Sequence, residues 1–158
     1  MGWAPKQPAT FLHEVLEPLR PLLARNEHEL VTQCDEALAV LWGDHGLLTR
    51  LLQNLVGNAI KFTPRGGQIV VGINRAPAGN TIELRVRDSG PGIAAAALPY
   101  IFDRYYQAPA DDRRDGNGLG LYFCRLVSEA HGGQIRAASQ LGGGTTVTVV
   151  LPVRPPQD

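Results

Sequence analysis

One helical segment, residues 46–62, limits what this 158-residue chain can fold into more than any other part of the sequence. Its apolar residues recur at steps of one, three and four, which predicts a wide stripe packed against a core. Polar residues repeat at steps of four, four and three and therefore share another face; these are Arg50, Asn54, Asn58 and Lys61. Asparagine is a poor helix former, so two of them one turn apart need a reason beyond solvation.

The residue types on this polar face suit a phosphate group that carries a metal ion. A carboxamide oxygen is a hard, neutral ligand for Mg²⁺, and a lysine one turn further along can pair with phosphate. An ordinary amphipathic helix explains the same spacing, and the helix alone does not decide between the two interpretations. The segments that follow it in the chain favour a ligand site.

The strand predicted at Thr81–Asp88 aims a carboxylate at the protein interior. Apolar and charged residues alternate along it, and Asp88 falls in phase with the apolar set. A buried carboxylate is costly unless a hydrogen-bond donor reaches it. Two partners fit: the exocyclic amine of an adenine, or the local backbone of the Ser89-Gly90-Pro91-Gly92 turn that follows. The strand pattern leaves both open.

Two glycine clusters complete the pattern. Gly116-Asn117-Gly118-Leu119-Gly120 opens a helix, and glycines at a helix start leave backbone N–H groups exposed to an oxyanion. Gly142-Gly143-Gly144 precedes a strand in which Thr145 is in phase with the apolar residues, so its hydroxyl points inward beside Asp88. An ordinary loop and a hairpin turn produce such clusters as well. The chain contains neither a Rossmann fingerprint nor a P-loop.

Taken in order, these blocks resemble the nucleotide-binding boxes of the GHKL ATPase superfamily, and specifically the catalytic ATP-binding domain of bacterial sensor histidine kinases. Residues 54–63 resemble the N box, 88–92 the first glycine box, and 101–106 (Ile-Phe-Asp-Arg-Tyr-Tyr) the F box. Residues 116–121 and 142–145 resemble the later glycine boxes. The resemblance spans roughly residues 10–153, nearly the whole chain.

The fold expected is an α/β two-layer sandwich of the Bergerat type, with three main helices on one face of a mixed, mainly antiparallel sheet. The ATP-binding domain is predicted at residues 9–154, with a mobile lid at about 107–116 and tails at 1–8 and 155–158. Strands are predicted at 9–11, 29–34, 39–42, 68–74, 81–88, 134–138 and 145–151. Besides the helix at 46–62, helices are predicted at 12–24, distorted by Pro18 and Pro21, at 94–100, and up to Ala130.

The resemblance also implies a role for each matching residue. Asn58 would ligate Mg²⁺, with Asn54 facing the same site, Lys61 pairing with phosphate and Asp88 accepting from the adenine amine. The nucleotide-binding set would further include Phe62, Gly90, Gly92, Ile93, Tyr106 and Thr145, and the hinge and phosphate cradle Gly116, Gly118, Leu119, Gly120 and Leu121. Gln107 stands where many relatives have a basic residue, so Arg104, Arg113 or Arg114 would supply the positive charge for the γ-phosphate. The catalytic set would be Asn54, Asn58, Lys61 and Arg104.

By this resemblance the chain is a Mg-ATP-binding catalytic domain that phosphorylates a histidine on a separate acceptor-helix domain, absent from this chain. ATPase branches of the superfamily usually have a glutamate base at the position of Asn54; an asparagine cannot serve as that base, which favours transfer to an imidazole. Two alternatives remain: a serine/threonine kinase of the anti-sigma type, and a non-catalytic, nucleotide-responsive interaction module.

Partners expected are the dimerisation and phosphoacceptor-helix domain of the same kinase and, indirectly, a response regulator. The formal net charge is zero, with 15 basic and 15 acidic residues and no basic run, which favours neither nucleic acid nor a membrane surface as a partner. A monomeric, cytoplasmic domain is expected, either free or as the cytoplasmic part of a membrane-bound sensor. Cys34 and Cys124 are predicted to be buried free thiols.

The histidines are predicted to lie outside the chemistry. His13 sits 45 residues before Asn58, too close for an acceptor hairpin, and the prolines that follow it break the helix. His28 and His45 are expected at the surface, and His131 at a helix C-terminus, where it meets free carbonyl groups.

Overall fold

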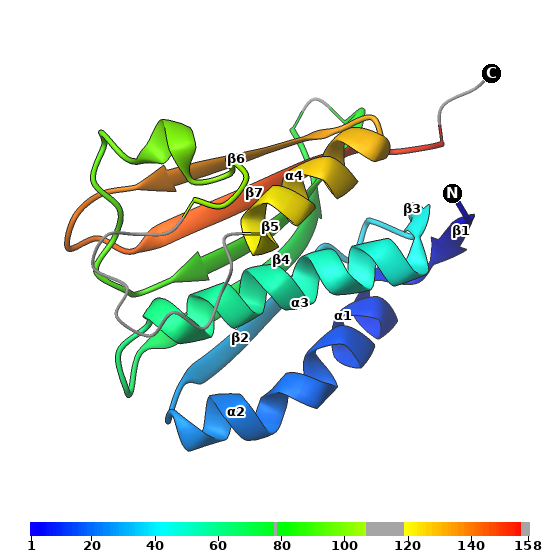
Figure 1. Ribbon diagram of the computed structural model, residues 1–158. Coiled ribbons are helices and arrows are strands. Elements are labelled where there is room, and N and C mark those ends of the chain that lie inside the picture. Colours follow the sequence, from blue (N-terminus) through cyan, green and yellow to red (C-terminus); the bar gives the residue numbers. More distant parts are fainter. Residues whose placement is uncertain (78, 107–118, 156–158) are drawn as a thin grey trace.

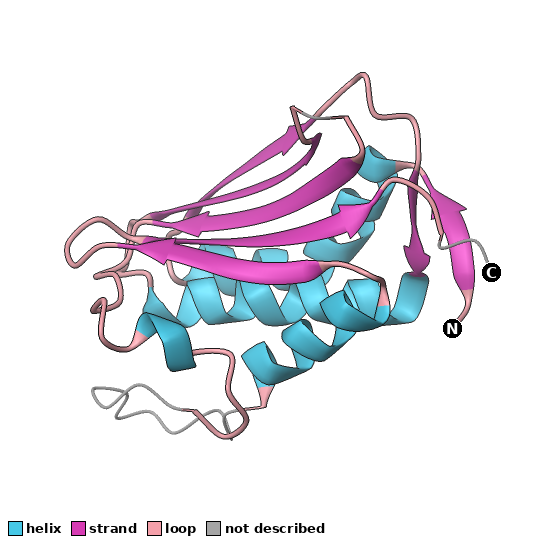
Figure 2. Cartoon of the chain, turned by 90° about the horizontal axis from the view of Figure 1, so that it is seen from above, coloured by secondary structure: helices cyan, strands magenta, loops and turns pink. Residues whose placement is uncertain are grey.

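A five-stranded sheet carries the helices on one of its faces (Figures 1 and 2). This computed structural model describes residues 1–77, 79–106 and 119–155. The strands lie in the order β2 (Glu29–Cys34), β4 (Gln68–Arg75), β5 (Thr81–Asp88), β7 (Thr145–Pro152) and β6 (Gln134–Ser139). β2 runs parallel to β4, and the other neighbours are antiparallel. The predicted mixed, mainly antiparallel sheet with helices on one face is confirmed.

The long helix α3 (His45–Phe62) lies across the sheet beside α4 (Gly120–Ala130), as Figure 1 shows. Asp44 caps its start, because the Asp44 carboxylate accepts from the backbone N–H of Leu47 at 3.0 Å. The helix ends before Pro64, as a residue preceding proline favours extended backbone. The predicted apolar stripe is buried, and it consists of Leu48, Leu51, Leu52, Leu55, Val56, Ala59 and Ile60.

The N-terminal segment differs from its prediction. Residues expected in a tail contain β1 (Trp3–Lys6), which pairs antiparallel with β3 (Leu41–Asp44). The strand expected at residues 9–11 is wrong, since they belong to α1 (Pro8–Leu16). Gln7 caps this helix through its side-chain oxygen, which accepts from the Thr10 N–H at 2.6 Å, and Pro8 occupies the first turn. Residues 9–11 (Ala-Thr-Phe) are too few to show a helical or a strand period, and the Gln7 cap and Pro8 favour a helix start here.

Prolines divide the next helix, as predicted. α1 is followed by a 3₁₀ turn, η1 (Glu17–Leu19), and then by α2 (Arg20–Arg25), with Pro18 and Pro21 near their respective starts. Two further elements differ from their predictions. β3 begins two residues later than expected, and the helix expected at 94–100 is only a 3₁₀ turn, η2 (Leu98–Tyr100). Within the described residues, no helix is long and apolar enough to cross a membrane.

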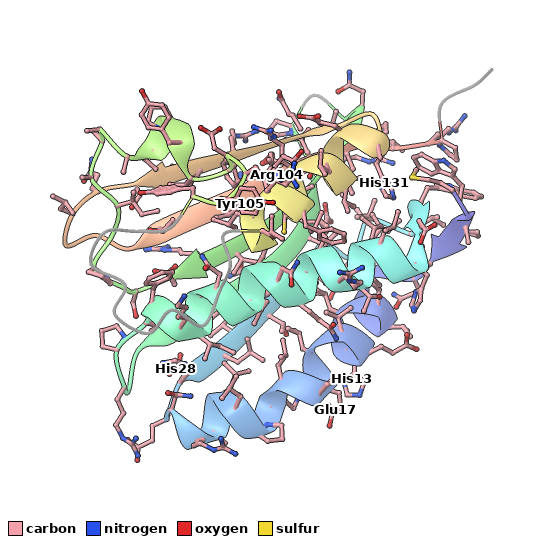
Figure 3. The ribbon with its side chains drawn as sticks, in the orientation of Figure 1. His13, Glu17, His28, Arg104, Tyr105 and His131 are labelled. Atoms are coloured by element: carbon pink, nitrogen blue, oxygen red, sulfur yellow. The ribbon has the colours of Figure 1, made fainter. Side chains whose placement is uncertain are left out.

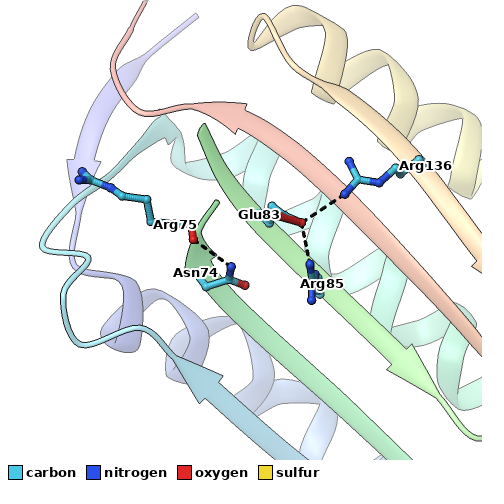
Figure 4. Close-up of polar contacts among 5 residues, drawn as sticks. All are labelled: Asn74, Arg75, Glu83, Arg85 and Arg136. Carbon is cyan, nitrogen blue, oxygen red and sulfur yellow. Dashed lines mark hydrogen bonds and ion pairs between the residues drawn. The ribbon is translucent and has the colours of Figure 1, made fainter. Parts of the chain in front are cut away.

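The outer face of the sheet is charged, as the alternation in β5 predicts. Glu83 is only 5% exposed there, because two arginine side chains fold over it (Figure 4). Its carboxylate pairs with Arg85 on the same strand at 2.9 Å and with Arg136 on β6 at 3.3 Å. The ion cluster therefore joins β5 to β6 across the intervening β7.

Two histidines are buried in the fold. His131 ends α4, as predicted, where its Nδ1 donates to the Val127 carbonyl at 2.7 Å. Its Nε2 accepts from the backbone N–H of Asp44 at 3.0 Å, and its ring lies 5.0 Å from that of Trp3, so it ties α4 to the β1–β3 ribbon. The surface position expected for His28 is wrong: this side chain is buried, with Nε2 3.0 Å from the Thr63 carbonyl. His13 and His45 are exposed, and both cysteines are free, with Cys124 buried and Cys34 half-buried.

We expect the free energy of unfolding to fall as the pH drops below about 6.5, because burial lowers the pKa of His131 in the folded chain. Between the unfolded and the lowered folded pKa, the unfolded chain binds more protons at this ring. The contribution of His131 to the free energy of unfolding is therefore complete above its pKa in the unfolded chain. It is lost as the pH falls toward its pKa in the folded chain. Of the adjacent charges, Asp44 opposes the lowering and Lys6 adds to it.

Urea unfolding measured from about pH 7.5 to 5.5 checks this prediction. Protonation of His131 should lower the free energy of unfolding by at most about 1.4 kcal/mol per pH unit. His131→Gln is the matched control, because its amide can still accept from the Asp44 N–H but cannot gain a charge. If the variant keeps the same pH slope as the parent, another group is responsible.

Candidate functional site

A cavity of about 720 Å³ opens between α3, the carboxyl end of β5 and the start of α4. Its lining brings together segments that lie far apart in the sequence. The predicted residues on its wall are Asn54, Asn58, Lys61, Phe62, Asp88, Gly92, Ile93, Tyr106, Gly120, Leu121 and Thr145. A volume of this size suits a ligand as large as a nucleotide.

Asp88 forms one end of the cavity. It is the last residue of β5 and pairs in register with Thr145, the first residue of β7, so both side chains lie on the helix-covered face. The carboxylate accepts from the Gly90 N–H at 2.8 Å, and it is half-buried. Burial raises the pKa of Asp88, while backbone N–H groups of Gly90 and Thr145 act in the opposite direction. The local-turn interpretation is therefore confirmed, and Asp88 also faces the cavity. The contact with an adenine amine stays a prediction.

Glycines let the loops behind Asp88 pack backbone against backbone. Gly92 has φ +82° and Gly144 φ +77°, a region that other residues rarely adopt. A Cβ atom at Gly92 would collide with the Gln140 carbonyl, and one at Gly144 with the carbonyl of Asp88. The two glycine-rich turns thus pack tightly around the end of the cavity that holds the carboxylate.

The polar face of α3 divides between two tasks. Asn54, Asn58 and Lys61 line the cavity, as the spacing predicts. Arg50 does not: its guanidinium lies 4.4 Å from the centre of the Phe123 ring and joins α3 to α4. Phe62 also lines the cavity, with the Lys61 ammonium 5.4 Å from its ring centre.

Other predicted site residues have different positions. Arg104 is exposed and is not part of the cavity lining; its guanidinium donates to the Tyr105 hydroxyl at 2.9 Å (Figure 3). Gly90 and Leu119 are not in the lining either. Gly116, Gly118, Arg113, Arg114 and the lid predicted at about 107–116 lie outside the described residues.

Sequence reasoning missed part of the wall. The cavity also reaches Leu22, Arg25 and Asn26 around the end of α2, and Gln53 and Gly57 on α3. No signal in the sequence could have found the α2 residues, because their place at the cavity depends on the tertiary structure and not on a local pattern. Val86 and Val147 could have been found, since they are in phase with Asp88 and Thr145 on neighbouring strands.

The side chains at the α3 side of the cavity fit a Mg²⁺ ion shared with phosphate. Among the described residues, no group of three or more His, Cys, Asp or Glu side chains could hold a metal ion. Asn54 and Asn58 offer carboxamide oxygens instead. Mg²⁺ commonly takes few protein ligands and completes its octahedron with water and substrate phosphates, so this donor set suffices.

Comparison with known families agrees with this geometry. The family model described as histidine kinase-, DNA gyrase B- and HSP90-like ATPase matches residues 43–155. The chain belongs to this family of ATP-binding ATPase domains.

Sensor kinases are among its similar relatives. The adaptive-response sensory kinase SasA of Synechococcus elongatus is 34% identical over 143 residues, which cover 90% of this chain and 37% of SasA. Histidine protein kinase DivJ of Caulobacter vibrioides is 43% identical over 111 residues, which cover 70% of this chain and 18% of DivJ. The structure of full-length ShkA in complex with AMPPNP superposes with a TM-score of 0.86 at 29% identity, over 100% of this chain and 32% of ShkA. The chain thus spans only about a third of the length of SasA and less of DivJ.

Proposed function

We propose that this chain is the Mg-ATP-binding catalytic domain of a two-component sensor histidine kinase, which transfers the γ-phosphate of ATP to a histidine on a separate acceptor-helix domain. The observation that carries the proposal is that Asp88 and Asn58, from different elements, open onto one cavity. The similarity to SasA and DivJ supports the same assignment.

In the proposed complex, adenine lies at the Asp88 end, where the carboxylate accepts from the exocyclic amine. The triphosphate extends along α3 past Asn58 and Asn54, and Lys61 pairs with phosphate oxygens. Bound Mg²⁺ would neutralise part of the phosphate charge. Asn54 has no basic group to accept a proton, so this side chain cannot activate water, whereas an imidazole nucleophile needs no such base. Positioning and electrostatic stabilisation therefore account for the catalysis.

The proposed partners are the dimerisation and phosphoacceptor-helix domain of the same kinase and, through it, a response regulator. The full-length ShkA structure contains AMPPNP, an ATP analogue, which supports ATP as the nucleotide here. The domain alone should bind ATP and ADP and autophosphorylate little, because the acceptor histidine is proposed to lie on a separate domain.

The test combines calorimetry with a transfer assay. ATP should bind in a Mg²⁺-dependent manner, and radiolabelled phosphate should move to the acceptor-helix domain when that domain is added. The phosphorylated product should be lost in acid, because phosphohistidine is acid-labile. An acid-stable product would instead identify a serine/threonine kinase of the anti-sigma type. Tight ATP binding without any transfer would identify a nucleotide-responsive interaction module.

A further inference from the structure

The cavity wall includes a positive charge that comes from the N-terminal helices. Arg25 is the last residue of α2; it lines the cavity and is exposed to solvent. Leu22, three residues earlier on the same face of this helix, lines the cavity as well. The charged side chains in the described lining are Arg25, Lys61 and Asp88. Arg25 therefore carries one of the two positive charges in the described part of the wall.

Contacts with the turn after α3 fix the end of α2 in place. The Asn26 carbonyl accepts from the Gly66 N–H at 3.3 Å. The buried His28 side chain places its Nε2 3.0 Å from the Thr63 carbonyl. Both contacts lie within three residues of Arg25, so its backbone is held beside the end of α3 while its side chain stays exposed.

The polar groups around Arg25 are engaged elsewhere. The Glu27 carboxylate pairs with Arg65 at 3.1 Å, and the Asn26 side chain donates from Nδ2 to the Leu22 carbonyl at 2.8 Å. Within the described part of the chain, Arg25 forms no ion pair with a carboxylate. A guanidinium is always charged at neutral pH and has only N–H donors, so it suits a phosphate group.

The cavity is open between Arg25 and the asparagine face of α3. Gln53 and Gly57 line this part of the wall, and each precedes an asparagine by one residue, so they form the neighbouring face of the helix. A Cβ atom at Gly57 would meet no described atom within 4 Å. The wall that carries Arg25 therefore adjoins the face on which Asn54 and Asn58 are proposed to hold the metal and the phosphates.

We propose that Arg25 binds the phosphate chain of the nucleotide from the α2 side of the cavity. The inference rests on the proposed function and adds a cation that the sequence did not reveal. Arg104, which was expected to supply such a charge, lies outside the lining, whereas Arg25 lies within it. Two cations, Arg25 and Lys61, would then attract the triphosphate, while the Asp88 carboxylate lies at the opposite, adenine end.

The experiment compares a ligand that carries phosphates with one that carries none. In Arg25→Gln, the affinity for ATP should fall by about threefold to tenfold, between the effect of an exposed ion pair and that of a buried charged hydrogen bond. The affinity for adenosine, measured by competition, should stay at the parental value. Arg25→Lys should lose less than Arg25→Gln, because it keeps the positive charge. Melting temperatures show that each variant is folded.

Arg20→Gln is the matched control. Arg20 is an exposed arginine on the same helix, pairs with Glu17 at 3.1 Å and does not line the cavity. Its replacement should leave ATP affinity unchanged. The salt concentration gives a further readout: the difference between the parent protein and Arg25→Gln should shrink as salt screens the charge, which a change in packing would not do.

Three results would overturn the inference. They are parental ATP affinity in Arg25→Gln, an equal loss of affinity for ATP and for adenosine, and an equal loss in Arg25→Lys and Arg25→Gln. Failure of the parent protein to bind ATP would instead contradict the proposed function, so the two failures are distinguishable.

Discussion

Asp88→Ala should lower the affinity for ATP by about a hundredfold, the upper size of a hydrogen bond to a charged group. Asp88 carries the acidic side chain in the described lining of the cavity, and in the proposed complex it accepts from the adenine amine. Calorimetric titration of ATP and ADP checks the prediction, and both should weaken alike because both carry the same base. Selectivity is a second readout: guanine has a carbonyl where adenine has its amine, so the parent protein should reject GTP.

Asp103→Ala provides the matched control for this substitution. Asp103 is an exposed aspartate that pairs with Arg125 at 3.6 Å and does not line the cavity. Its loss should leave ATP affinity unchanged. The melting temperature of both variants should also be measured, because Asp88→Ala removes the acceptor for the Gly90 N–H and can affect stability. A folded Asp88→Ala protein with parental ATP affinity would refute the position proposed for the base.

Asn58→Ala should remove the Mg²⁺ dependence of nucleotide binding and lower phosphotransfer to an added acceptor domain by about a hundredfold. In the proposed complex the Asn58 carboxamide oxygen ligates the metal, and alanine removes this oxygen while keeping the helix. The measurement is ATP affinity with Mg²⁺ and with EDTA, which should become equal in the variant.

Gln53→Ala is the control for Asn58. Gln53 carries the same functional group on the same helix and also lines the cavity, but it does not share the face that repeats through Asn54 and Asn58. It should keep the parental response to Mg²⁺. Equal responses in the two variants would mean that the metal is held elsewhere.

The parts of the fold that follow a period could be predicted from the sequence. The apolar pattern is long enough to identify the buried side in α3 and in the long strands β4, β5 and β7. The phase of this pattern alone placed Asp88 and Thr145 on the inner face, which the register of β5 and β7 confirms. β1 and its pairing with β3 could not be predicted, because a four-residue strand carries no clear period.

Contacts between distant segments explain three features that local patterns did not reveal. His28 is buried, and its Nε2 lies within hydrogen-bond distance of the Thr63 carbonyl, 35 residues away in the sequence. No local pattern indicates that contact. Arg50 shares a helix face with Asn54, yet its guanidinium packs on the Phe123 ring of α4 and does not line the cavity. The residues around the end of α2 reach the cavity for the same reason.

Because Asp88 pairs with Thr145, the proposed recognition of the base depends on the alignment of β5 and β7. Side chains alternate between the faces of a sheet, so a shift of β7 by one residue would turn Thr145 to the solvent and bring Thr146 inward. The length of the turn at residues 140–144 thus sets the register of β7 as well as connecting β6 to it. Inserting or deleting a single residue there should disturb the purine end of the cavity first and leave the α3 wall intact.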